Sequence, residues 1–166
     1  MWFDEFKTPI GLLKIAVDAT GLRYVMFEQN KYQPPSPGDW RRDSSPTREA
    51  REQLQQYFSG DRKEFDLKTS LAGTEFQQRT WRSLAFIPYG RTWSYAELAK
   101  RVGSPKAVRA VGAANGRNPI PIILPCHRVI GSNGALTGFG GGLPVKKWLL
   151  EHEANSIAAT FNRSKR

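Results

Sequence analysis

The stretch SYAELAKRVGSPKAVRAVGAAN, residues 94–115, decides the fold of the second half of the chain. Ser94 is a residue type that caps helices, and Tyr95–Val102 has the apolar spacing of a short helix. A Gly-Ser turn follows, and Pro105 stands near the start of a second helix that runs to about Asn115. Two short helices joined by a glycine-containing turn are typical of a helix-turn-helix. Because many helical hairpins share this pattern and bind nothing, it favours DNA binding without establishing it.

The second predicted helix consists almost entirely of small or slender side chains, with Arg109 as its one long residue. These side chains belong to Ala107, Val108, Ala110, Val111, Gly112, Ala113 and Ala114. Such a helix either packs tightly against its neighbours or enters a narrow groove. The minor groove of B-DNA is about 6 Å wide, so this helix would suit it better than one with bulky base-reading side chains.

Before this stretch, the chain predicts a small lobe with an antiparallel sheet. Trp2–Phe6 and Leu12–Val17 flank a turn at residues 8–11 and predict a hairpin, and Leu22–Phe27 predicts a third strand. The proline-rich stretch Gln33–Gly38 marks a loop.

A helix is predicted at Pro46–Phe58, with Ala50, Leu54 and Phe58 on its apolar face and a stop at Gly60. We find no set of catalytic residue types in this first lobe.

The character of the sequence changes at residues 71–73, where a second lobe begins. Thr74 is a predicted N-cap for a helix that ends at residues 88–90. The apolar stripe of this helix is Phe76, Trp81, Leu84 and Ala85. The sequence therefore predicts an α+β protein with a first lobe at 1–72, a DNA-binding and active-site lobe at 73–156, and a frayed basic tail at 157–166.

The composition is that of a folded, basic protein. Hydrophobic residues make up 39% of the 166 residues, and 25 Lys and Arg face 15 Asp and Glu, for a formal net charge of +10. Such an excess favours polyanionic partners, although charge alone fits a basic globular protein equally well. No apolar run is long enough to span a bilayer and the N-terminus lacks the pattern of a signal peptide, so we expect a cytoplasmic protein with no membrane partner.

Cys126 is the only cysteine, and His127 and His152 are the only histidines. An internal disulfide and a zinc site built from several Cys and His ligands are both excluded. We therefore expect no metal ion and no cofactor, and interpret His152 as a structural residue. Any chemistry at Cys126 would be nucleophilic.

An apolar run bracketed by prolines, residues 118–125, delivers Cys126 and His127 to a fixed position. A thiol is mostly protonated near neutral pH, and a neighbouring base raises its thiolate fraction. Adjacent side chains of an extended segment point to opposite faces, so a bridging water or a backbone kink would be needed. On these residues alone, a cysteine before a histidine is more often a buried small residue than a nucleophile.

A last helix opens at Pro144, with Val145, Trp148 and Leu149 on one face. Glu153 falls one turn after Leu149, beside that face. A carboxylate at the edge of a core needs a partner, and a histidine is the natural one.

Residues 125–131, PCHRVIG, resemble the active-site signature of the O6-alkylguanine-DNA alkyltransferases. Further segments follow the order and spacing of that family. They are Phe76-Gln77, Trp81, Ile87-Pro88-Tyr89-Gly90, Ser94-Tyr95, Ala110-Val111-Gly112-Ala113-Ala114-Asn115, Asn118-Pro119 and Trp148-Leu149-Leu150. The likeness is dense in the second half of the chain and loose in the first lobe. The assembled set is specific, whereas any single piece is not.

The resemblance implies a ribonuclease H-like first lobe and a mainly helical, winged-helix-like second lobe whose helix-turn-helix docks in the minor groove. The damaged nucleotide would be flipped out of double-stranded DNA. The alkyl group, methyl in the simplest case, would move irreversibly from O6 of guanine, and from O4 of thymine, to Cys126. Because the product is a thioether, each molecule would act once. The resemblance also implies a monomer in solution and leaves cooperative binding on DNA open.

The resemblance assigns chemical roles to five residues. Cys126 would be the nucleophile, and His127 would take its proton through a bound water. Glu153 would orient the imidazole, and Asn118 would brace the segment. Tyr95 would donate a proton or a hydrogen bond to the departing guanine, and its ring would crowd the target phosphate to aid flipping.

The residues expected at DNA or at the flipped base are Tyr95, Arg109, Ala110, Gly112, Ala113, Asn115, Arg117, Arg128, Val129, Phe139 and Gly140. Arg109 would fill the gap that the flipped nucleotide leaves. The carbonyls of Cys126 and Val129 would read the guanine amino group, and the Gly140 amide would contact O6. Gly140 also stands where some relatives carry a polar residue, which would open the pocket to larger adducts. Some relatives hold a structural zinc, for which this sequence has no ligands.

Three other functions are compatible with parts of the pattern. A lesion sensor of the alkyltransferase-like kind would lack the cysteine, so Cys126 argues against it. A transcriptional regulator would carry base-reading side chains on its second helix, where Arg109 stands almost alone. A cysteine hydrolase normally has its histidine far from the cysteine in sequence.

Overall fold

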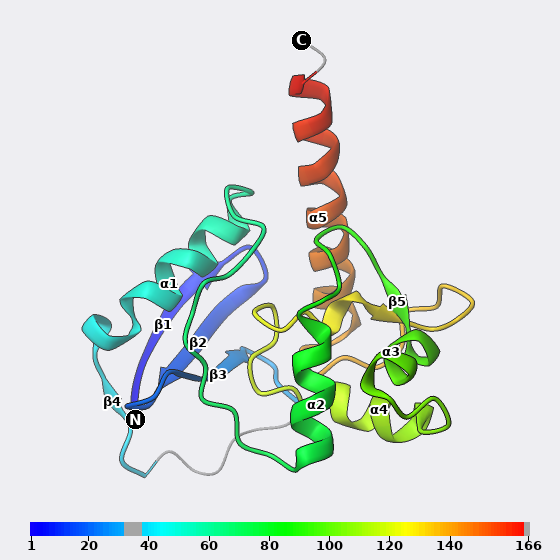
Figure 1. The fold of residues 1–166 in the computed structure, drawn as a ribbon. Helices are drawn as coiled ribbons and strands as arrows, with labels where there is room; N and C mark the ends of the chain where they lie inside the picture. Colours follow the sequence, from blue (N-terminus) through cyan, green and yellow to red (C-terminus); the bar gives the residue numbers. More distant parts are fainter. Residues whose placement is uncertain (32–37, 165–166) are drawn as a thin grey trace.

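The computed structural model describes residues 1–31 and 38–164, with side chains to residue 161. It has two lobes: a sheet covered by one helix, and a mainly helical lobe from which the last helix projects (Figure 1). Of the predicted loop Gln33–Gly38, only Gly38 lies within the described residues.

The first lobe is built on a four-stranded sheet of order β3-β2-β1-β4. The strands are β1 (Trp2–Thr8), β2 (Gly11–Val17), β3 (Leu22–Phe27) and β4 (Arg41–Arg42). The first three are antiparallel neighbours, which confirms the predicted hairpin and third strand, and β4 pairs with β1 in parallel. The sequence did not predict β4, because two exposed arginines carry no strand pattern.

Helix α1 (Ser44–Phe58) packs against β1 and β2. It begins two residues before the predicted Pro46, because the Asp43 side chain caps its first turn. The predicted apolar face of this helix is wrong at its last residue: Tyr57 is fully buried, whereas Phe58 is only partly buried. Burying a large apolar side chain contributes roughly 1.5–3 kcal/mol, so Tyr57 is a main anchor of this helix.

Helix α2 (Glu75–Leu84) begins at the predicted N-cap. Thr74 and Gln77 form a capping box, in which each side chain bonds the backbone of the other. The helix ends before the predicted 88–90, because the amides of residues 85–87 bond carbonyls three residues back and tighten the chain into turns.

Helices α3 (Tyr95–Val102) and α4 (Val108–Gly116) form the predicted helix-turn-helix, packed on α2. Gly103 ends α3 in the left-handed conformation, with φ of 88°. The start predicted near Pro105 is wrong: residues 104–107 form a turn closed by a backbone hydrogen bond of 2.9 Å, and α4 begins after it.

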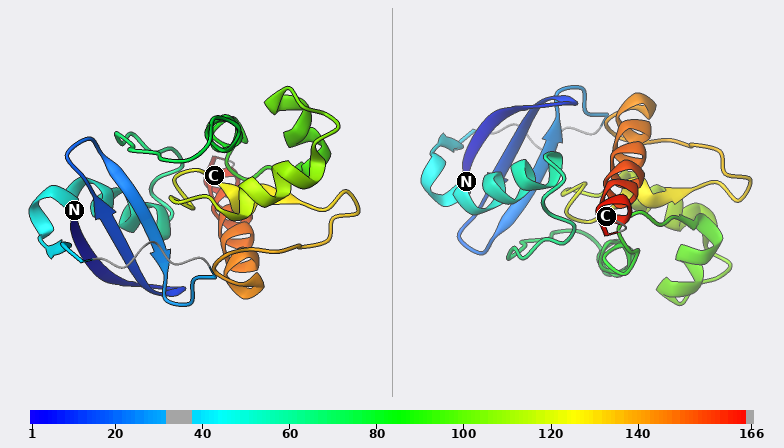
Figure 2. Two further views of the ribbon diagram at one scale, coloured as in Figure 1. Left: turned by 90° about the horizontal axis from the view of Figure 1, so that it is seen from below. Right: turned by 90° about the horizontal axis from the view of Figure 1, so that it is seen from above.

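Two short strands, β5 (Trp93–Ser94) and β6 (Val129–Ile130), pair in parallel beside the 3₁₀ turn η1 (Cys126–Arg128). The last helix, α5 (Leu143–Ser164), lies between the sheet of the first lobe and helices α3 and α4 in both views of Figure 2. The frayed tail predicted for 157–166 is wrong as far as Ser164, because α5 continues to that residue. Within the described chain, no helix is long and apolar enough to cross a membrane.

Candidate active site

The loop before Cys126 is braced by one side chain. Asn118 donates from Nδ2 to the Leu124 carbonyl at 2.7 Å and accepts at Oδ1 from the Ile120 amide at 3.0 Å. Within this loop, Ile122 has φ of 75°, a left-handed conformation that costs a side-chain-bearing residue roughly 1–2 kcal/mol. Asn118 therefore holds a strained segment in the conformation that delivers the cysteine.

The turn η1 separates the side chains of three consecutive residues. A 3₁₀ turn rotates each residue by about a third of a turn relative to the last. Cys126 consequently lines a cavity, while His127 and Arg128 both reach Glu153. This turn is a backbone kink, one of the two alternatives that the sequence left open for Cys126 and His127 to work together.

Glu153 on α5 lies at the centre of a buried polar network. Its Oε2 is 2.6 Å from His127 Nε2 and accepts from the Tyr57 hydroxyl at 2.7 Å. Arg128 donates from Nε to Oε1 at 2.8 Å and from Nη2 to Oε2 at 3.0 Å, and the Gly90 amide donates to Oε1 at 3.3 Å. A buried carboxylate is stable only when it is paired and hydrogen-bonded in this way.

These contacts set the protonation of the histidine. Burial opposes ionisation of Glu153, but hydrogen bonds and charges from His127 and Arg128 outweigh it and hold the pKa of Glu153 well below its usual range. Burial lowers the pKa of His127, against the raising effect of Glu153. Facing a carboxylate, Nε2 carries the proton of the neutral imidazole, which leaves Nδ1 as an acceptor. Nδ1 is buried and has no hydrogen-bond partner among the described residues.

Burial raises the pKa of the Cys126 thiol to about 11, although the Asn118 side chain and the charge of Lys146 act in the opposite direction. The thiol is therefore protonated at neutral pH, and a nucleophilic role needs a base that accepts its proton. A neutral His127 is suited to be that base.

Lys146 is a buried cation that the sequence interpretation missed. Its Nζ donates to the Val129 carbonyl at 2.6 Å and to the Thr137 carbonyl at 3.0 Å, and burial lowers its pKa to about 8. The signal was present, because residues 146, 149 and 153 share one helical face. Lys146 ties β6 and the loop after it to α5.

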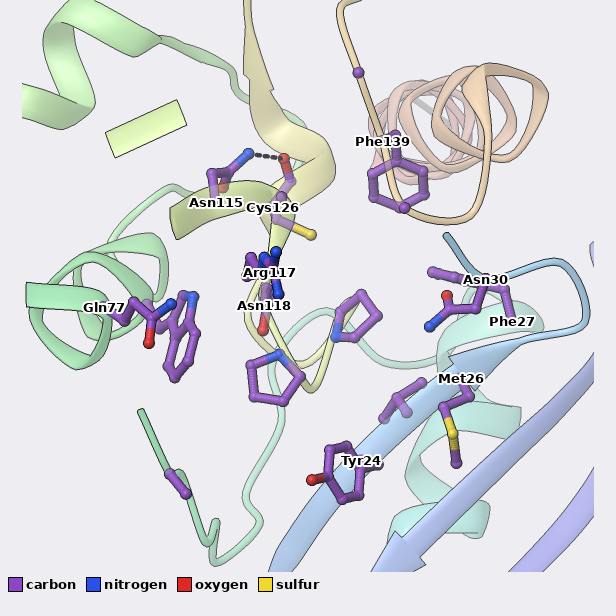
Figure 3. A pocket seen from close by; sticks show the side chains of 18 residues that line it. Tyr24, Met26, Phe27, Asn30, Gln77, Asn115, Arg117, Asn118, Cys126 and Phe139 are labelled. Carbon is purple, nitrogen blue, oxygen red and sulfur yellow. Dashed lines mark hydrogen bonds between the residues drawn. The ribbon is translucent and has the colours of Figure 1, made fainter. Parts of the chain in front are cut away.

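A cavity of about 240 Å³ lies between the lobes and contains Cys126. Its lining includes Tyr24 and Met26 of β3, and also Asn118 and Phe139 of the second lobe. Figure 3 shows the Cys126 sulfur directed into the space between Asn118 and Phe139.

A second cavity, of about 670 Å³, is lined by Tyr95, Arg109, Gly112, Ala113 and the loop around Phe139 and Gly140. Arg109 and Ala113 are exposed, as is Ala110 on the same helix. The hydroxyl of Tyr95 accepts a hydrogen bond from Thr137 at 2.9 Å. The two cavities share Gly116, Gly138, Phe139 and Gly140. Arg117 is exposed and lines the cavity of Cys126.

The placement of Arg128 on DNA is wrong. This side chain is 6% exposed, and besides Glu153 it donates to the Ile87 carbonyl at 2.7 Å. Its charge balances the buried carboxylate, so it is not exposed to bind DNA phosphates. An arginine in a sequence looks the same whether its charge is solvated or buried, so only its partners distinguish the two.

Two further expectations are modified by the contacts found. Asn115 is buried, donates to the Cys126 carbonyl at 3.4 Å and lines the cavity of the thiol, so it does not lie on an open DNA surface. The Val129 carbonyl accepts from Lys146. The Cys126 carbonyl accepts from the Val129 amide as well as from Asn115, so both carbonyls expected to read the guanine amino group already accept hydrogen bonds within the protein.

Tyr57 is the other network member that sequence reasoning missed. It lies in the first lobe, 96 positions before Glu153, and no motif connects the two. In the described parts of the chain, no group of three or more His, Cys, Asp and Glu side chains could hold a metal ion.

Two family models match this chain. Residues 3–71 match the ribonuclease-like domain, and residues 75–155 the DNA-binding domain, of 6-O-methylguanine DNA methyltransferase. The chain is 50% identical over 155 residues to the methylated-DNA–protein-cysteine methyltransferase of Methanosarcina acetivorans, covering 93% of this chain and 99% of that protein. It is 48% identical over 157 residues to the Mycobacterium tuberculosis protein of the same name, covering 95% and 94%.

The fold agrees with these sequence relationships. The crystal structure of Mycobacterium tuberculosis OGT in complex with DNA superposes with a TM-score of 0.90 at 46% identity, covering 94% of each chain. The chain belongs to the 6-O-methylguanine DNA methyltransferase family.

Proposed function

We propose that the protein repairs DNA by transferring an alkyl group from O6 of guanine to Sγ of Cys126. The observation that carries the proposal is the position of Cys126. Its sulfur faces a cavity, while the next residue is a neutral histidine anchored to a buried carboxylate. No other cysteine in the chain could accept the group.

The reaction is a displacement at a saturated carbon. The S–C bond forms as the C–O6 bond breaks, and the thiol proton passes to Nδ1 of His127, through a water molecule. Tyr95 donates a proton to the departing guanine and recovers one through solvent from the imidazolium. Asn118 holds the loop that positions the thiol.

The product explains why the protein would act once. The alkylated cysteine is a thioether. Regenerating the thiol would require the cysteine thiolate to leave from a saturated carbon, which does not occur at neutral pH, and cellular thiols do not cleave the C–S bond. One alkyl group is therefore accepted per molecule.

Double-stranded DNA is the proposed partner. A solved relative at 46% identity is a complex with DNA, and this chain carries a formal net charge of +10. The exposed small residues Ala110 and Ala113 let α4 approach a minor groove, and Arg109 beside them would occupy the gap left by a flipped nucleotide. Phe139 and Gly140, which line both cavities, would contact the flipped guanine.

We assign the first lobe to residues 1–72 and the DNA-binding and active-site lobe to 73–156. We propose that the protein works as a monomer, in the cytoplasm, on O6-alkylguanine and on O4-alkylthymine.

The test is the intact mass of the protein after incubation with excess duplex DNA containing O6-methylguanine. The expected result is a gain of one methyl group, located on the peptide that contains Cys126, with no further gain at longer times. Tight binding to the lesion without any mass gain would instead establish a lesion sensor.

A further inference from the structure

One residue of the first lobe, Tyr57 of α1, contacts the carboxylate at the centre of the buried network. Its hydroxyl donates to Glu153 Oε2 at 2.7 Å, and its backbone carbonyl accepts from His152 Nε2 at 2.7 Å. His152 also stacks on Trp148, with ring centroids 4.7 Å apart. Tyr57 thus contacts two consecutive residues of α5 at the position where the carboxylate lies.

The hydroxyl of Tyr57 and the imidazole of His127 share the same carboxylate oxygen. Oε2 of Glu153 is 2.7 Å from the first and 2.6 Å from the second. Tyr57 and Glu153 are both fully buried. Burial and the charge of Glu153 raise the pKa of Tyr57 well above its usual value, so its hydroxyl remains a donor. Without this donor, a lone pair of a buried charged group loses its partner.

We propose that Tyr57 is a positioning residue for alkyl transfer: it fixes the Glu153 carboxylate from the first lobe and, through it, the imidazole of His127. The inference rests on the proposed role of His127 as the base for Cys126. It gives the ribonuclease-like lobe a part in the chemistry that acts through Glu153 and His127.

The effect on the histidine follows from the charges that face Glu153. His127 and Arg128 approach it from η1, the Gly90 amide from the loop before β5, and Tyr57 from α1. Each donor disperses part of the carboxylate charge. When the Tyr57 hydroxyl is removed, the carboxylate becomes more basic and holds a proton on His127 more strongly. The pKa of His127 therefore rises in the variant, and the histidine stays protonated, and unable to act as a base, up to a higher pH.

The experiment compares Tyr57→Phe with Tyr89→Phe. Both remove one hydroxyl from neighbouring rings, whose centroids lie 6.2 Å apart, but only Tyr57 donates to the carboxylate. Two rates are measured against pH: alkylation of Cys126 by iodoacetamide, and methyl transfer from duplex DNA containing O6-methylguanine. Thermal unfolding of each variant gives the stability.

For Tyr57→Phe, we expect both rates at neutral pH to fall about 5- to 20-fold, a part of the roughly 10²- to 10⁴-fold that a positioned base contributes. The acidic limb of both profiles should move to higher pH. Tyr89→Phe should leave rates and midpoints unchanged. The inference would be overturned if Tyr57→Phe changed neither the two rates nor the midpoint of the acidic limb. It would also be overturned if the rates fell only in proportion to lost stability while that midpoint stayed unchanged.

A second substitution keeps the test decisive if Tyr57→Phe does not fold. Replacing Tyr57 by 3-fluorotyrosine keeps the hydroxyl and makes it a stronger donor, so the acidic limb should move to lower pH. A limb that stays in place, or moves upward, contradicts the inference. If the iodoacetamide profile moves as expected but the unmodified protein accepts no methyl group from DNA, the proposed function fails and the role of Tyr57 stands.

Discussion

The buried network around Glu153 and the exposed face of α4 depend on different physical effects. In the network, both oxygens of the Glu153 carboxylate accept short hydrogen bonds from His127, Arg128 and Tyr57, in a low-dielectric interior where each contact is strong. On α4, Arg109 is exposed among small residues, on a surface where attraction between basic side chains and DNA phosphates would be long-range and screened by salt. The chemistry at Cys126 therefore depends on geometry, whereas the access of DNA to α4 depends on charge and on the absence of bulky side chains.

The largest expected effect is the complete loss of methyl transfer with DNA binding retained, which would separate the role of the buried network from that of the α4 surface. Cys126→Ala should abolish methyl transfer, because no other thiol exists, and should leave DNA binding close to that of the unmodified protein, because the α4 surface is unchanged. Transfer is measured by intact mass and binding by fluorescence anisotropy with a lesion duplex. Substantial residual transfer would remove Cys126 from its role.

Within the network, Glu153→Gln should lower the free energy of unfolding by about 3–5 kcal/mol, because it leaves the buried Arg128 without its counter-charge. The matched control is Glu151→Gln on the same helix, where an exposed carboxylate faces Lys147 at 3.9 Å and the change should stay within about 0.5 kcal/mol. Urea unfolding of both variants measures the difference. Equal losses would show that the network does not stabilise the fold.

On the α4 surface, Arg109→Ala should slow repair in duplex DNA by about 10-fold or more, since flipping a nucleotide costs a few kcal/mol that this side chain would offset. Reaction with a free O6-alkylguanine base should change much less. Arg48→Ala removes the same charge from an exposed site on α1 and serves as the control. If Arg109→Ala slows the duplex and the free base equally, its assignment to the gap in the duplex is wrong.

The smallest expected effect concerns the pH dependence of stability. Burial lowers the pKa of His127 below its ordinary 6.5, so below pH 6.5 the unfolded chain binds a proton that the folded protein does not. The free energy of unfolding should therefore fall as the pH decreases from 6.5. It should fall further below pH 4.5, where the depressed pKa of Glu153 adds in the same direction. Urea unfolding between pH 7.5 and 4 tests the sign, and a stability that rises on acidification would contradict a neutral His127.

Local patterns predicted several elements of the fold. The bounds of β3 and α3 were confirmed, and Thr74 and Ser94 cap α2 and α3 as expected. Caps and turns act over a few residues, so their physics is contained in the sequence nearby. The starts of α1 and α4 were placed wrongly, because a proline near a helix start does not fix which residue is the cap.

The sequence by itself determined the composition of the reactive segment: one cysteine, the adjacent histidine, and a glutamate on the inner face of the last helix. Only the tertiary structure decided what surrounds them. It placed Arg128 on Glu153, Lys146 under the Val129 carbonyl, and the Tyr57 hydroxyl on the carboxylate from 96 positions away. The physical reason is that a buried charge requires partners at short distance in space, and those partners come from whichever elements the packing of the two lobes brings together.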